Sequence, residues 1–146
     1  MTIMLKKNRL LSMILAILFL ISIVMLIQKN QKIQSSQKRI DDLASMCINN
    51  AWYGFSEYLH DPSQKNYLNG MNAFYTYYML YRETSYYKSC FGQVLTNTYD
   101  TLLLDDRVDI TDIQRLVDAL ELLTKDPFDV RGYSALRRFK KIPLLE

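Results

Sequence analysis

The sequence contains few residues that break helices: only four glycines and three prolines occur among 146 residues. This scarcity argues against a turn-rich β-sandwich and against a disordered linker protein. A chain of this length forms one compact domain rather than several. It also has a single histidine and two cysteines. Because one histidine cannot form a histidine pair, a zinc site of the HExxH type is excluded.

Acidic residues are absent from the first 39 positions, whereas the rest of the chain holds all 15 acidic residues and 11 of the 18 basic ones, a balance of −4. The basic residues of the first segment are Lys6, Lys7, Arg9, Lys29, Lys32, Lys38 and Arg39. The positive net charge therefore comes from the basic residues that flank one segment, and it does not indicate a basic binding face. We predict no nucleic-acid partner.

Those basic residues flank a long apolar run. From Leu10 to Ile27, 16 of 18 positions are apolar, and the exceptions are Ser12 and Ser22. As a helix this run spans about 27 Å, close to the hydrocarbon thickness of a bilayer. Each serine hydroxyl can bond to the carbonyl one turn earlier, so neither is costly in lipid. We predict a single-pass protein of the cell membrane.

A cleaved signal peptide is the alternative, but its apolar region is usually about 7–15 residues long and is followed by a small-residue cleavage site. The residues after Ile27 are Gln-Lys-Asn-Gln-Lys, which favours an uncleaved signal-anchor.

Three basic residues precede the apolar run and four follow it closely, so the positive-inside rule gives only a small preference for either orientation. We expect the N-terminus in the cytoplasm and the following domain outside, because a short tail is easily retained.

Beyond the run, apolar residues recur at helical spacing in four blocks that begin near Ile40, Tyr67, Tyr87 and Ile110. Asp61-Pro62-Ser63 and Asp126-Pro127 separate blocks, since proline cannot continue a helix. The predicted fold is all-α: an N-terminal single transmembrane helix followed by an up-down bundle of four helices plus a short C-terminal helix. The predicted division is a basic tail at 1–9, the transmembrane helix at 10–27, a polar helical stalk at 28–39 and the bundle at 40–146.

The two cysteines, Cys47 and Cys90, fall at similar heights in this bundle, and we expect both to face its interior. A disulfide between them is geometrically allowed if their helices are close, and it would persist only in an oxidising compartment. Two free buried thiols are the alternative.

Aromatic residues are dense between Tyr67 and Phe91, with nine in 25 positions. Most of them lie on the predicted core face, where tyrosine packs its ring and keeps its hydroxyl at the rim. Tyr75 and Tyr77 flank that face, so we expect these two to be exposed and available for contact.

The C-terminal segment is basic and interleaved with apolar residues. Its cations are candidates for contact with anionic lipid or an acidic partner; the alternatives are packing on the acidic fourth helix or solvation. These residues are Arg131, Arg137, Arg138, Lys140 and Lys141.

No motif for catalysis occurs in the sequence: it has no glycine-rich phosphate loop and no G-x-S-x-G elbow. We therefore predict that the protein is not an enzyme and uses no cofactor or metal. The leading hypothesis is a protein-interaction or scaffolding module at a bacterial-type cell envelope, with a protein partner or self-association. The alternative is an extracytoplasmic module that binds a cell-wall sugar or small molecule through exposed tyrosines.

Overall fold

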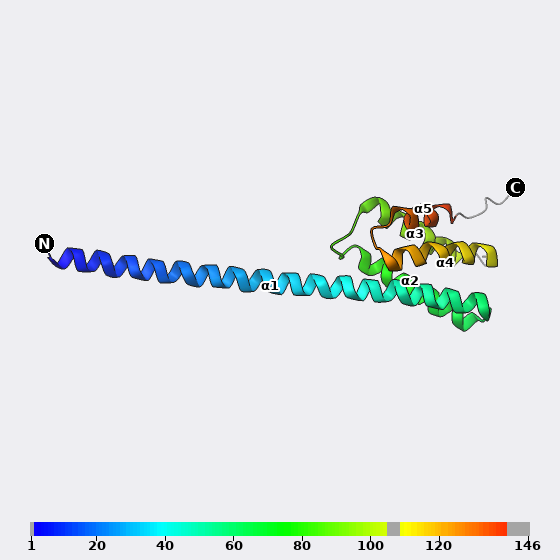
Figure 1. Cartoon of the computed structure of the whole chain (residues 1–146), viewed down its shortest axis with the longest axis horizontal. Helices are drawn as coiled ribbons and strands as arrows, with labels where there is room; N and C mark the ends of the chain where they lie inside the picture. Colours follow the sequence, from blue (N-terminus) through cyan, green and yellow to red (C-terminus); the bar gives the residue numbers. More distant parts are fainter. Residues whose placement is uncertain (1, 105–108, 140–146) are drawn as a thin grey trace. The chain divides into compact units, whose positions relative to one another are not determined.

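A computed structural model describes the backbone of residues 2–104 and 109–139, and the side chains from residue 13 onward within these ranges. This part of the chain holds five α-helices and no strand (Figure 1). The helices are α1 (Thr2–His60), α2 (Gln64–Tyr81), α3 (Ser89–Leu104), α4 (Ile110–Lys125) and α5 (Val130–Arg138). The prediction of an all-α fold with one long apolar N-terminal helix is confirmed.

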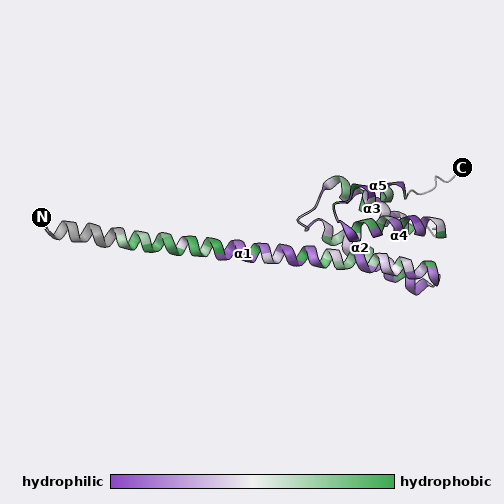
Figure 2. Ribbon diagram, in the orientation of Figure 1, coloured by the Kyte–Doolittle hydropathy of each residue, from purple (hydrophilic) through white to green (hydrophobic). Residues whose placement is uncertain are grey.

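Contacts divide the chain into two units, Met1–Ser36 and Gln37–Glu146. In the first unit every described side chain, from residue 13 to residue 36, is exposed. Figure 2 shows a continuous hydrophobic stretch here that changes to hydrophilic residues further along α1. Ser22 Oγ donates to the Leu18 carbonyl at 2.9 Å, as the sequence predicts. α1 is thus long and apolar enough to cross a membrane.

The second unit is a helical bundle whose first helix is the C-terminal part of α1. α1 ends at His60, and Ser63 caps the start of α2 by accepting from the Asn66 N–H at 3.3 Å. The break predicted at Asp61-Pro62-Ser63 is therefore confirmed. α4 likewise ends at Lys125, just before Asp126-Pro127.

Two glycines bring α1 and α2 into backbone contact. A Cβ atom on Gly54 would lie 2.5 Å from the backbone nitrogen of Gly70, and one on Gly70 would lie 2.9 Å from the ring of Phe55. Any side chain at Gly54 would separate the helices. Further along, Gln37 Nε2 donates to the Glu83 carbonyl at 2.8 Å. Since Gln37 and Gly54 contact Glu83 and Gly70 respectively, the two helices are antiparallel.

Asp41 fastens the loop after α2 to α1. Its carboxylate accepts from the Ser85 N–H at 2.8 Å, from the Ser85 hydroxyl at 2.6 Å and from Gln37 Nε2 at 3.3 Å. Desolvation raises the pKa of this carboxyl, but the hydrogen bonds from Ser85 and Gln37 outweigh it, so the pKa lies below its ordinary value. The contacts therefore favour the ionised carboxylate.

Candidate interaction surfaces

Tyr77 is fully buried, so the expectation that it is exposed for contact is wrong. Its hydroxyl lies 3.1 Å from that of Tyr133 on α5, and the Tyr133 hydroxyl donates to the Pro127 carbonyl at 3.2 Å. Because each hydroxyl has one proton, Tyr77 is the donor to Tyr133. This chain of hydrogen bonds ties α2 to α5 and to the turn before it. Tyr77 is therefore a core residue.

Further rings surround these two hydroxyls. Tyr81 lies 5.9 Å from Tyr77 and 6.1 Å from Tyr133, centroid to centroid, and Phe91 stacks on Tyr133 at 4.0 Å. Desolvation raises the pKa of Tyr77, Tyr81 and Tyr133, and it raises that of Tyr86 to about 12, helped by the nearby Asp41 carboxylate. All four hydroxyls therefore stay neutral at physiological pH.

Tyr75 is exposed, as the sequence predicts, with 42% of its surface accessible. Its ring lies 5.0 Å from that of Tyr99 on α3, and Tyr99 in turn stacks on Tyr78 at 6.0 Å with 14° between the rings. Tyr78 and Tyr99 are half-buried. The result is a small aromatic platform on the α2–α3 surface.

A second exposed surface follows one face of α1 within the bundle. Leu43, Met46 and Tyr53 are 39%, 53% and 60% exposed, and Asn50 between them is exposed as well. Their spacing of i, i+3, i+7 and i+10 places them on one side of the helix, away from the buried face of Ala44, Ile48, Ala51 and Phe55. We call these four residues the α1 stripe.

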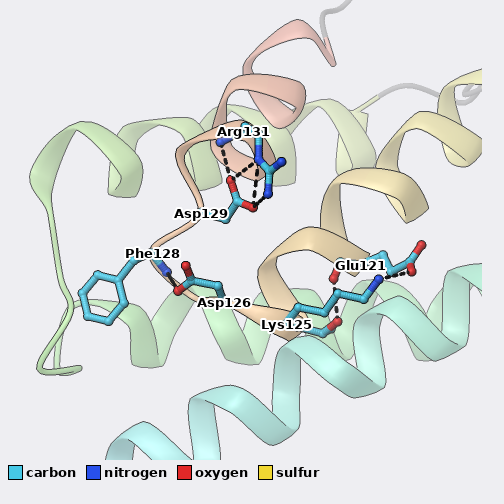
Figure 3. Close-up of polar contacts among 7 residues, drawn as sticks. Glu121, Lys125, Asp126, Phe128, Asp129 and Arg131 are labelled. Carbon is cyan, nitrogen blue, oxygen red and sulfur yellow. Dashed lines mark hydrogen bonds and ion pairs between the residues drawn. The ribbon is translucent and has the colours of Figure 1, made fainter.

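The basic C-terminal residues do not share one environment. Arg131 is held by Asp129: its Nη2 and Nε atoms lie 2.7 and 3.1 Å from the carboxylate oxygens, and Figure 3 shows the two side chains turned toward each other. The same carboxylate caps α5 by accepting from the Arg131 N–H at 2.8 Å. Arg137 and Arg138 are exposed, and neither forms an ion pair within the described part of the chain. Lys140 and Lys141 lie outside the described residues.

A cavity of about 700 Å³ lies between α3 and the end of α5. Val94, Leu136 and Phe139 form its apolar part, and Asn97, Thr101, Arg137 and Arg138 supply its polar groups. Sequence reasoning marked the two arginines but missed the cavity. Val94 falls within the apolar block that begins near Tyr87, and Asn97 and Thr101 carry no pattern that distinguishes them from other polar helical residues.

Both cysteines are free thiols in the structure, Cys47 buried and Cys90 exposed. The expectation that both face the interior is therefore wrong for Cys90. The buried face of α3 runs through Leu95, Thr98 and Leu102, and Cys90 lies off it at the start of the helix. Burial raises the pKa of the Cys47 thiol. The pairing of the two residues stays a prediction.

Within the described residues, no group of three or more His, Cys, Asp or Glu side chains is placed to hold a metal ion. Comparison of the chain with protein-family models, with curated proteins and with solved structures finds no match.

Proposed function

We propose that this chain is a single-pass membrane protein whose helical bundle binds another protein, or a second copy of itself, at the surface of a cell envelope. The observation that carries the proposal is the α1 stripe, in which three large apolar side chains share one exposed face of a long helix. Scattered exposed apolar residues are ordinary, but residues aligned at this spacing suit a partner helix. An anchor in the same membrane raises the effective concentration of such a partner.

The test is site-specific crosslinking in native membranes. A photo-reactive amino acid replaces Met46, and a matched variant carries it at Gln114, an exposed position on α4. We expect Met46 to yield one discrete crosslinked protein and Gln114 to yield none. Equal crosslinking from both positions, or none from either, contradicts the proposal.

The same proposal places the N-terminus in the cytoplasm and the bundle outside. A reporter fused after Glu146 that is active on only one side of the membrane tests this orientation. An external signal supports it, and an internal signal contradicts it. A mature protein that lacks residues 1–27 would instead identify the apolar run as a cleaved signal peptide.

A second candidate function is the binding of a cell-wall sugar. The observation in its favour is the platform of Tyr75, Tyr78 and Tyr99, because an exposed aromatic face can stack on an apolar sugar face. Replacing Tyr75 by Ala should abolish binding to isolated cell wall while leaving the unfolding midpoint unchanged. Unchanged wall binding would exclude this function for the platform.

A further inference from the structure

We propose that the cavity between α3 and α5 binds a segment of a partner protein in which an acidic residue lies beside a large apolar one. The inference rests on the proposed protein-binding function and names the chemistry of the partner. It concerns a surface built from α3 and α5, whereas the function was argued from the α1 stripe.

The size and lining of the cavity suit a ligand with an apolar part. Its volume of about 700 Å³ lies within the range typical of binding pockets. Leu136 and Phe139 line it as nearly buried side chains, with 1% and 6% of their area accessible, and half-buried Val94 lines it with them. A bulky aliphatic or aromatic side chain placed here would cover this apolar surface.

The polar groups at the cavity select the charge of the ligand. Arg137 and Arg138 line the cavity, and none of the lining residues within the described part of the chain is acidic. Asn97 Oδ1 already accepts from Gln93 Nε2 at 3.0 Å, so the side-chain amide of Asn97 offers its N–H donors. This donor set fits a carboxylate, which accepts several hydrogen bonds and pairs well with arginine.

Arg131 on the same helix shows that an arginine of α5 forms an ion pair when an acidic residue is nearby. Its guanidinium already pairs with Asp129, whereas Arg137 and Arg138 have no such partner among the described residues. The positive charge available to a partner is therefore concentrated at the cavity and not spread along α5. An apolar ligand without charge would leave these donors to water, and a free anion would leave the apolar surface uncovered.

The experiment is a selection from a random peptide library against the full chain in lipid nanodiscs. We expect the enriched peptides to carry Asp or Glu next to Leu, Phe or Met. The double substitution Arg137→Gln with Arg138→Gln should weaken their binding at least about tenfold, because charge-assisted hydrogen bonds are lost. Arg131→Gln, a matched change on the same helix, should alter the dissociation constant by less than about twofold.

Enriched peptides that lack acidic residues, binding that survives the double substitution, or no enrichment would each overturn the inference. The two arginines are exposed, so their replacement does not threaten the fold, and an unchanged unfolding midpoint verifies this. A discrete crosslink at Met46 with no acidic peptide selected would leave the proposed function standing and remove the inference. Arg-dependent acidic peptides without a crosslink at Met46 would support the inference and remove the role of the α1 stripe.

Discussion

Two segments of α1 present their apolar residues differently. From Met13 to Ile27 apolar side chains surround the helix, and all are exposed. Between Ala44 and Phe55 the buried apolar residues share one face that packs against the bundle, whereas Met46 and Tyr53 of the α1 stripe stay exposed on another face. A helix that is apolar all round needs an apolar environment on every side, whereas an amphipathic helix needs it on one side only. The bundle supplies the second environment, and a bilayer would supply the first.

The difference shows that one continuous helix can suit two environments, a bilayer along one segment and the core of a bundle along another. Substitutions that damage one end of α1 should leave the other intact, and five predictions test this separation and the packing behind it.

The largest effect is expected from charge in the all-round apolar part. Leu18→Lys with Ile21→Lys places two cations near the centre of the run, each at a cost of about 3 kcal/mol in a bilayer. The chain should be lost from membranes washed with alkaline carbonate. Leu68→Lys with Met79→Lys, at exposed sites of the bundle, should leave retention unchanged. Equal retention of both variants would contradict a membrane role for the apolar run.

The next largest effect concerns the contact between α1 and α2. Gly54→Ala forces a Cβ atom to within 2.7 Å of Gly70 Cα, and backbone cannot yield as a side chain can. We expect a loss of about 3 kcal/mol of unfolding free energy. Urea titration followed by fluorescence of Trp52, the one tryptophan of the chain, measures it.

Gly92→Ala is the matched control for that change. Its Cβ would approach the Tyr87 ring at 3.3 Å, and exposed Tyr87 can move. The change should therefore be below about 1 kcal/mol in either direction. If both variants were equally stable, the two helices would not be in backbone contact.

A smaller loss of unfolding free energy is expected from removing the hydroxyl of a buried tyrosine, and almost none from removing that of exposed Tyr75. Tyr77→Phe and Tyr133→Phe each remove a member of the hydrogen-bonded chain, and each should cost about 1 kcal/mol. The double variant should cost less than the sum, because both single changes remove the same bond. Tyr75→Phe should change the unfolding free energy by only a few tenths of a kcal/mol. Strict additivity of the two core variants would exclude the bond.

The pH dependence of stability tests the fastening of the loop to α1. Since the pKa of Asp41 is lowered by folding, its ionised form stabilises the bundle above the ordinary pKa of 3.8, and this contribution is lost as the pH falls below that value. Asp41→Asn should cost about 1 kcal/mol at pH 7, a modest figure because Asp41 is only half-buried and water screens its charge. The cost should vanish in acid. A cost that persists at low pH would show that charge is not responsible; Asp42→Asn is the exposed control.

The smallest effect is on reactivity rather than stability. An alkylating reagent should label exposed Cys90 at least about tenfold faster than Cys47, because Cys47 is buried and burial raises the pKa of its thiol. Comparable rates would contradict the burial of Cys47. In protein recovered from the membrane without reductant, resistance of both residues to labelling until reduction would show that both thiols are oxidised, as a Cys47–Cys90 disulfide requires.

Helix periodicity and proline positions were sufficient to predict the all-α fold and the break at Asp61-Pro62-Ser63. They did not separate Tyr75 from Tyr77, since both flank the apolar stripe of α2. The partner decides between them: Tyr133, 56 residues away, accepts a hydrogen bond from Tyr77. The position of Cys90 was predicted wrongly for a similar reason. Tertiary contacts bury the face of α3 that holds Leu95, Thr98 and Leu102, and Cys90 does not lie on that face.

The sequence by itself determined the long apolar run, the helical periods and the distribution of charge, because these depend on local order along the chain. Only the tertiary structure decided which arginine of α5 is paired, which tyrosine is buried and where a cavity opens. Asp129 binds Arg131, whereas Arg137 and Arg138 form no ion pair within the described residues, and α3 brings Val94, Asn97 and Thr101 beside them. The buried tyrosine and the cavity depend on contacts between residues far apart in the chain, and a helical period contains no information about them.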